Sequence, residues 1–128
     1  MNKLHQVSAE VHRLSAAEAE LWVRIEAMTA NSATEVRGRL TGPRCANVTT
    51  IEVAYPLQPF PRHPDGWPPL SRRVVIPDPS LWEQENPFTY HAILELWQDG
   101  QRCDLAEFDY GFRMAGERSG RIESRTKG

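Results

Sequence analysis

Alternating apolar and polar positions are clearest between residues 90 and 97. The apolar set begins at Tyr90 and ends at Leu96, and Trp97 belongs to the opposite phase. A period of two over eight positions predicts a β-strand with one apolar face. Asp99-Gly100 comes next, and this dipeptide favours the positive φ angles of a tight hairpin. The chain is therefore expected to turn straight back into a strand over residues 102–112.

The returning strand carries two apolar sets that do not share one phase. Cys103 and Leu105 occupy one phase, whereas Phe108, Tyr110 and Phe112 occupy the other. A regular strand would place these two sets on opposite faces. We therefore expect a β-bulge near residues 105–107 that brings both sets to the same side.

Shorter alternating segments precede this hairpin. They predict strands over residues 5–13, 20–29, 36–40, 48–55 and 72–76, with turns over residues 14–19 and 31–34. Gly42-Pro43 is expected to end the third of these strands, and six prolines make residues 56–69 a long extended loop. Seven or eight short strands without a long helix predict an all-β fold, a two-sheet antiparallel β-sandwich over residues 1–113. Residues 114–128 are polar and basic, and we expect them to form a flexible C-terminal tail.

The segment between residues 76 and 90 is interrupted by prolines. Pro77, Pro79 and Pro87 lack the N–H group that continuous strand pairing needs. Leu81-Trp82 therefore lies in an irregular crossing between two strands. A large apolar pair in such a crossing is expected to cap one end of the core.

This crossing and the last strand contain an ordered motif, whose residues are Asp78-Pro79, Leu81-Trp82, Pro87, Tyr90 and Gly111-Phe112-Arg113. The motif resembles that of the immunoglobulin-like β-sandwich domain of family 2 glycoside hydrolases, which lies between their sugar-binding domain and their catalytic barrel. The resemblance implies an immunoglobulin-like sandwich; an unrelated sandwich with a Leu-Trp crossing is the alternative.

The resemblance also implies that the catalytic acids belong to the barrel that follows the Gly-Phe-Arg segment. No catalytic residue therefore carries over to this chain. Arg113 matches the family arginine near the junction with the barrel. The sequence ends soon after Arg113, so we expect either a stand-alone domain without the barrel or a fragment of a larger hydrolase.

Charge balance and the lack of long apolar runs argue against several classes of protein. Fifteen basic and seventeen acidic residues give a net charge of −2, which argues against nucleic-acid binding. No apolar run reaches the length of a membrane span, and residues 1–5 lack the apolar segment of a signal peptide, so we expect a cytoplasmic protein.

Cys45 and Cys103 invite comparison with the disulfide of antibody domains, but position 101 is Gln where that pattern has Tyr, and we expect reduced thiols.

A search for catalytic chemistry gives a negative result. The four histidines have no metal-ligand spacing, and the sequence contains no phosphate-binding loop, nucleophile elbow or metalloprotease helix. The acidic residues lie in turns or on the polar phase of strands, where a solvated face is expected. We therefore predict no metal, no cofactor and no enzymatic activity in this chain.

Three residues suggest a contact surface. Trp22 and Trp97 lie opposite the aliphatic face of their strands, and Ile93 shares the phase of Trp97. If they are neighbours, they form an exposed apolar patch for a protein partner or for self-association. The alternative is that residues of the loop or the tail cover these tryptophans.

Trp67 lies close to His63 and Asp65 in the proline-rich loop. One interpretation is a carbohydrate site in which Trp67 stacks on a sugar ring; the other is a tryptophan that caps the end of the sandwich. The leading hypothesis is thus a non-catalytic interaction module, and a carbohydrate-binding module is the second. A small enzyme whose acids converge only in three dimensions is the third.

Overall fold

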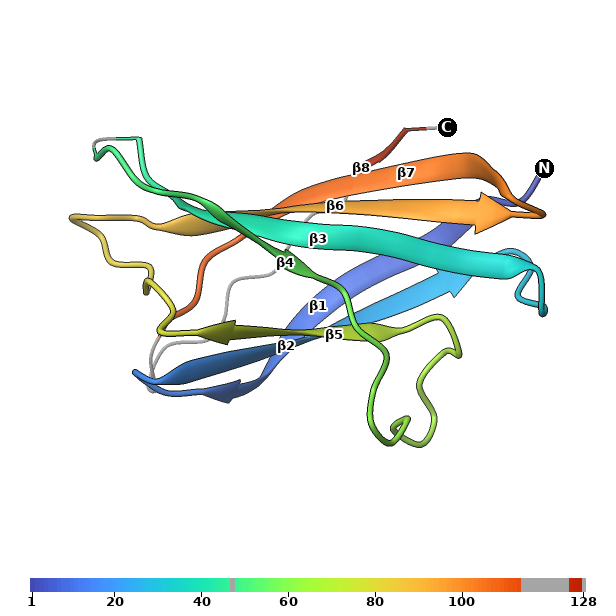
Figure 1. Ribbon diagram of the computed structural model, residues 1–128, viewed down its shortest axis with the longest axis horizontal. Coiled ribbons are helices and arrows are strands. Elements are labelled where there is room, and N and C mark those ends of the chain that lie inside the picture. Colours follow the sequence, from blue (N-terminus) through green and yellow to red (C-terminus); the bar gives the residue numbers. More distant parts are fainter. Residues whose placement is uncertain (47, 114–124, 128) are drawn as a thin grey trace.

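A computed structural model of the chain describes residues 1–46, 48–113 and 125–127. In this part of the chain the regular elements are strands: β1 (Leu4–Leu14), β2 (Glu18–Ala27), β3 (Thr34–Arg44), β4 (Val53–Pro56), β5 (Arg72–Pro77), β6 (Thr89–Gln98), β7 (Gln101–Tyr110) and β8 (Arg125–Lys127). They form two antiparallel sheets with the strand orders β1-β2-β5 and β4-β3-β6-β7-β8, which lie one above the other in Figure 1. The predicted all-β, two-sheet sandwich is confirmed. None of the described segments is a helix of the length and apolarity that a membrane crossing needs.

The core lies between the sheets, where alternate residues of each strand are buried. On β6 the predicted apolar face from Tyr90 to Leu96 is at most 2% exposed, and on β2 the residues from Leu21 to Ile25 alternate in the same way. The predicted hairpin after β6 is also present, with φ angles of 53° at Asp99 and 78° at Gly100. On β2 and β6, strict alternation therefore predicted the correct buried face.

The third strand does not stop at Gly42-Pro43, as the sequence suggested. β3 continues to Arg44, because a register shift between Thr41 and Arg44 lets pairing with β6 resume beyond the proline. Gly42 is needed for close packing, since a Cβ atom there would lie 2.7 Å from Cδ2 of Tyr90.

The fourth strand is shorter than predicted. The sequence indicated a strand over residues 48–55, but β4 begins at Val53 and its pairing with β3 starts at Gly42. The ladder with β3 ends at the pair of Gly42 and Val53, where the register shift in β3 begins, so residues 49–52 are left without strand partners. Ile51 is consequently 89% exposed instead of lying on a buried face.

The bulge in the last hairpin lies at Cys103 and not at residues 105–107. Leu96 pairs with Asp104 and Trp97 with Arg102, so Cys103 is the extra residue. From Asp104 onward the buried residues alternate regularly, and Leu105 lies on the outer phase. A polar residue at a core position hid this register, because Asp104 is only 3% exposed and accepts a 2.8 Å hydrogen bond from the N–H of Leu4.

Both cysteines are free thiols. Cys45 follows β3 near the start of β6, whereas Cys103 contacts the carbonyl oxygen of Leu96 near the end of β6. The two therefore lie at opposite ends of the five-stranded sheet, and the antibody-like disulfide is not formed.

Most of the predicted tail, residues 114–124 and 128, lies outside the described residues; Arg125–Lys127 form β8, whose backbone pairs with β7.

Candidate functional site

The motif residues selected from the sequence meet at one end of the sandwich. The N–H of Trp82 donates a 2.7 Å hydrogen bond to the carbonyl oxygen of Phe112, and the guanidinium carbon of Arg113 lies 3.8 Å from the centroid of the Trp82 ring. Gly111 permits this contact, because a Cβ atom there would lie 2.8 Å from Cδ1 of Trp82. We call this group, Trp82 with Gly111, Phe112 and Arg113, the junction cluster.

Three buried aromatic rings connect the junction cluster to the core. Phe112 lies edge-on to Tyr90 and to Tyr110, with ring centroids 5.4 and 5.0 Å apart. The hydroxyl oxygen of Tyr90 accepts a 2.9 Å hydrogen bond from the N–H of Ser80, and burial raises the pKa of Tyr90. The other motif residues also pack at this end: Pro79 is buried and Leu81 packs against the core. Pro87 forms an isolated β-bridge with Trp82, and the N–H of Asp78 donates a hydrogen bond to the carbonyl oxygen of Ala17 in the β1–β2 turn. The cluster thus closes one end of the core.

The three residues predicted to share a contact surface do not lie together. Trp22 is on β2 in the three-stranded sheet, whereas Ile93 and Trp97 are on β6 in the five-stranded sheet. Each alternates with buried residues of its own sheet, so Trp22 and Trp97 point to opposite outer faces of the sandwich. Alternation identifies the outward residues of a strand but not the sheet to which the strand belongs, which is why the pattern alone could not separate them.

Trp97 is held in a polar network on the outer face of the five-stranded sheet. The guanidinium carbon of Arg37 lies 3.9 Å from the centroid of its ring, and its Nε1 donates a 3.1 Å hydrogen bond to Glu95. Arg102 donates to the other carboxylate oxygen of Glu95 at 3.2 Å. The hydrogen bond from Trp97 has the largest influence on the pKa of Glu95 and lowers it. Burial raises this pKa, and the hydrogen bond from Arg102 lowers it further, so the pKa of Glu95 lies below the ordinary glutamate value. Together with half-buried Ile93, these residues form what we call the Trp97 face.

Trp22 is covered by the proline-rich loop, as the alternative interpretation proposed. Phe60 and Trp67 lie edge-on to its ring at centroid distances of 5.0 and 5.2 Å, and His12 stacks on it at 3.9 Å. The loop is anchored by two 2.8 Å backbone hydrogen bonds between Gln58 and Arg73 of β5. The sequence could not show this contact, because it joins two segments that no local pattern relates.

Trp67 borders a hollow of about 460 Å³ between the loop and the end of β2. The guanidinium carbon of Arg24 lies 4.4 Å from the centroid of its ring. His63 does not line the hollow: its Nε2 lies 3.1 Å from the carbonyl oxygen of Trp67 and its ring contacts Phe60. Asp65 is exposed and does not line it either. Of the three residues proposed for a sugar site, the structure therefore places one at the hollow, and Trp67 covers the outer face of the sheet instead of an end of the sandwich.

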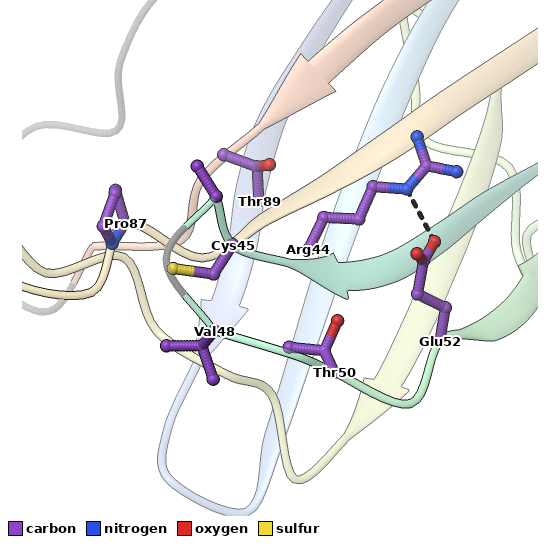
Figure 2. Close-up of a pocket in the computed structure, with 8 residues that line it drawn as sticks. Arg44, Cys45, Val48, Thr50, Glu52, Pro87 and Thr89 are labelled. Atoms are coloured by element: carbon purple, nitrogen blue, oxygen red, sulfur yellow. Dashed lines mark hydrogen bonds and ion pairs between the residues drawn. The ribbon is translucent and has the colours of Figure 1, made fainter.

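A second hollow, of about 520 Å³, lies in the β3–β4 hairpin (Figure 2). Arg44 and Glu52 form an ion pair with a separation of 2.6 Å on one side, and Cys45, Val48 and Pro87 lie on the other. It opens where residues 49–52 leave the β3 ladder. Glu52 is the one carboxylate among its lining residues.

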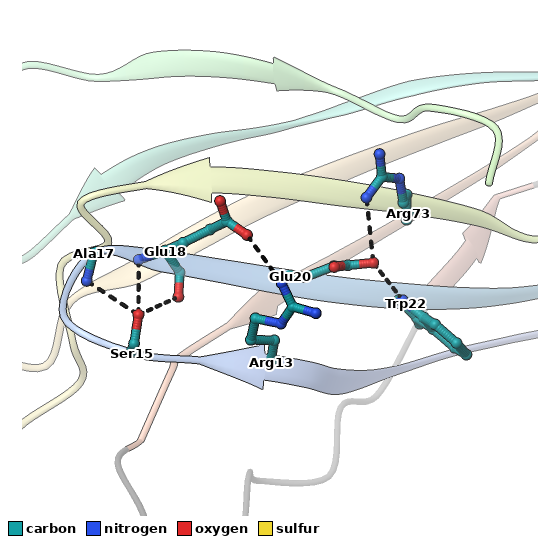
Figure 3. Close-up of polar contacts among 7 residues, drawn as sticks. All are labelled: Arg13, Ser15, Ala17, Glu18, Glu20, Trp22 and Arg73. Atoms are coloured by element: carbon teal, nitrogen blue, oxygen red, sulfur yellow. Dashed lines mark hydrogen bonds and ion pairs between the residues drawn. The ribbon is translucent and has the colours of Figure 1, made fainter. Parts of the chain in front are cut away.

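Glu20 is a buried acid, although it shares the outward phase of β2 with Trp22. It is 7% exposed, and its Oε2 atom accepts a 2.8 Å hydrogen bond from Nε1 of Trp22 and lies 3.4 Å from Nη1 of Arg73 (Figure 3). Burial raises the pKa of Glu20, but the hydrogen bonds from Trp22 and Arg73 together outweigh it, so the pKa lies below the ordinary glutamate value. Trp22 and Arg73 are cross-strand partners, and only the pairing of β2 with β5 could have pointed to this group.

His91 lies between two acids on the outer face of the five-stranded sheet. Its Nδ1 is 2.8 Å from Asp109, its cross-strand partner, and its Nε2 is 3.2 Å from Glu107. The hairpin at residues 99–100 together with a one-residue bulge places His91 opposite Asp109, so the sequence contained a signal for this pairing. Within the described ranges, no group of three or more histidine, cysteine or acidic side chains is arranged to hold a metal ion.

Comparison with known proteins gives this arrangement a context. The family model described as "Glycosyl hydrolases family 2" matches residues 3–113. The chain belongs to glycosyl hydrolase family 2. A solved structure of a β-glucuronidase from this family is similar in fold, with a TM-score of 0.54 and 13% sequence identity over 88% of the present chain. No curated protein matches the chain.

The family assignment confirms the resemblance inferred from the motif, and the junction cluster shows what the motif does in the fold. The family 2 chain described here spans 13% of the length of the matched β-glucuronidase. At 13% identity the likeness supports the fold alone, so nothing about the activity of that enzyme transfers to individual residues.

Proposed function

We propose that this family 2 chain is a non-catalytic β-sandwich module that acts through contacts with another protein domain. The observation that supports the proposal is the Trp97 face. There the indole of Trp97 contacts the guanidinium group of Arg37 and donates a hydrogen bond to the carboxylate of Glu95, which also accepts one from Arg102. These side chains are therefore already ordered before a partner binds. Tryptophan and arginine are enriched at protein interfaces, and side chains that are already ordered lose less entropy when a partner binds. The junction cluster, by contrast, is engaged in closing the core.

The composition of the two hollows supports the non-catalytic part of the proposal. Glycoside hydrolysis ordinarily uses two carboxyl groups that face the sugar from opposite sides of the scissile bond. Glu26 is the one acid that lines the hollow beside Trp67, and Glu52 is the one acid that lines the hollow in the β3–β4 hairpin. Neither hollow presents the pair that the reaction needs.

We expect the purified chain to release no chromophore from aryl β-glucuronides, β-galactosides or β-mannosides above the rate in buffer. Glu52→Gln and Glu26→Gln are the control variants, because each removes the one acid of a hollow. Hydrolysis that either substitution abolishes would overturn the non-catalytic assignment. Hydrolysis that persists in both variants and elutes together with the chain on further purification would place the activity at other acids and would also overturn the assignment. Activity that separates from the chain would come from a contaminating host glycosidase.

The partner we propose for the Trp97 face is a family 2 catalytic barrel, in the same polypeptide or in a separate one. A photoreactive benzophenone side chain at position 93 is expected to cross-link to a purified family 2 barrel on irradiation. The same group at position 10 of β1, on the other sheet, is expected not to cross-link. Equal labelling from both positions, or none from position 93, would contradict the proposed surface.

A further inference from the structure

The edges of the two sheets are not equally protected against pairing with another strand. β1 has two register shifts along its length, and β5 is bridged to Gln58 of the proline-rich loop. β7 carries the bulge at Cys103 and pairs with β8 over residues 105–107. β4 has no irregularity in its ladder with β3, and Val53 and Ala54 are both exposed. A regular, exposed edge is a template for another strand.

The residues that lead into β4 have the composition of a strand, but in the described structure Val48 forms only an isolated bridge to Cys45, and residues 49–52 belong to no strand. Val48, Ile51 and Val53 are 43%, 89% and 47% exposed, and β-branched residues of this kind favour paired strands. In Figure 1 the β3–β4 hairpin reaches beyond the ends of β2 and β5, so the opposite sheet does not cover it. The segment thus exposes an apolar surface and a free backbone edge at the same place.

We propose that β4 pairs with β4 of a second copy of this chain, antiparallel and about a two-fold axis at Val53. The direction of the backbone groups decides which residues can bond. The N–H of Leu57 donates to the carbonyl oxygen of Gly38, so Tyr55 and Val53 also point their backbone groups toward β3. By the same alternation, Ala54 and Glu52 direct theirs outward, toward the second copy.

The neighbouring registers are less favourable. An axis at Glu52 places two carboxylates directly opposite each other, and like charges in such a pair are destabilising. An axis at Ala54 places Glu52 opposite Pro56 of the second copy, which has no N–H group to donate. An axis at Val53 pairs Glu52 with Ala54 of the second copy, so that the outward N–H and C=O groups on both sides of the axis find partners.

The same register covers the exposed apolar side chains. Ile51, Val53 and Tyr55 share one face of the segment, and Tyr55 already packs edge-on to Tyr90 with centroids 6.3 Å apart. The axis brings the two Val53 side chains together and sets Ile51 beside Tyr55 of the second copy. Glu52 keeps its ion pair with Arg44. The dimer joins two five-stranded sheets into one continuous sheet. It does not use the Trp97 face, and Glu52 contributes only its backbone groups to it, so it stands independently of the proposed function.

The test is a disulfide across the axis. Cα atoms of a non-hydrogen-bonded antiparallel pair lie about 4.5 Å apart, within the range that a disulfide spans. Val53→Cys, in a chain in which Cys45 and Cys103 are replaced by serine, is expected to oxidise to a covalent dimer. Glu10→Cys, exposed on β1, is the control in the same background and is expected to remain largely monomeric. Cross-linking of Val53→Cys that does not exceed that of the control would overturn the proposal.

Ala54→Pro separates dimerisation from folding. Its N–H group points away from β3, so proline there removes an outward donor without breaking the β3–β4 ladder. Sedimentation equilibrium between about 10 µM and 1 mM is expected to show a monomer–dimer equilibrium for the unmodified chain and a monomer for Ala54→Pro. The melting temperatures of the two are expected to agree at the lowest concentration, where the dimer adds least to the stability of the unmodified chain. A monomeric unmodified chain over that range, or an Ala54→Pro variant that dimerises equally well, would overturn the proposal.

Discussion

Replacing Phe112 with alanine is expected to lower the free energy of unfolding by about 3–5 kcal/mol, the usual range for removing a fully buried phenylalanine. Phe112 is 0% exposed and lies edge-on to Tyr90 and Tyr110, so the substitution leaves a cavity lined by rings that cannot collapse into it. The backbone hydrogen bond from Trp82 to the carbonyl oxygen of residue 112 remains possible in the variant, so the expected loss comes from the side chain. Urea denaturation followed by far-ultraviolet circular dichroism measures the change.

Phe60→Ala is the matched control for this substitution. Phe60 also contacts aromatic rings, but it lies half-buried in the loop on the outer face of the three-stranded sheet. Its removal is expected to cost less than half as much, because surrounding water and loop movement can fill the space. Equal losses for the two variants would mean that the junction cluster does not close the core.

Alternation predicts this fold correctly where the buried side of a strand carries apolar residues in a regular period of two, as on β2 and β6. The hairpin of β6 and β7 follows from Tyr90 to Leu96 and from the turn at Asp99-Gly100, because the period of two and the turn chemistry are both local properties. The motif around Trp82 likewise predicted one packed end, since prolines exclude continuous pairing there. Local signals of this kind are therefore sufficient to predict the fold class and the position of the core.

The features that alternation could not predict depend on which strand pairs with which. Residues 49–52 have a strand composition, yet the ladder with β3 ends beside Pro43 and leaves Ile51 in solvent. The bulge at Cys103 was hidden because Asp104 occupies a buried position that an apolar residue usually takes. Trp22 and Trp97 belong to different sheets, which no one-dimensional pattern records. Of the three residues predicted for the contact surface, Ile93 and Trp97 therefore share a face. The contacts of Trp97 with Arg37 and Glu95 could not be predicted from the sequence.

Glu20→Ala is expected to lower the free energy of unfolding by about 2–3 kcal/mol at neutral pH, because it removes hydrogen bonds to a charged group and leaves Trp22 Nε1 without its acceptor. The expected cost is smaller for Glu20→Gln, which retains an acceptor oxygen but no charge. Glu18→Ala on the same strand is the control: its ion pair with Arg13 measures 4.0 Å between side chains that are 43% and 64% exposed, and such pairs contribute about 0–1 kcal/mol (Figure 3). Chemical denaturation of the three variants at pH 7 gives the order, and a cost for Glu18→Ala equal to that of Glu20→Ala would contradict it.

The pH dependence of these variants tests the charge itself. The folded-state pKa of Glu20 lies below the ordinary value of 4.5 that the unfolded chain has, so the unfolded state binds the proton more readily. The stabilisation from Glu20 is therefore fully present above about pH 4.5 and is lost as the pH falls through the lower folded pKa. The difference in unfolding free energy between the unmodified chain and Glu20→Gln should be constant from pH 7 to pH 5 and should shrink below that range. A difference that stays constant down to pH 3 would show that the carboxylate contributes through its shape and hydrogen bonding alone, and not through its charge beside Arg73.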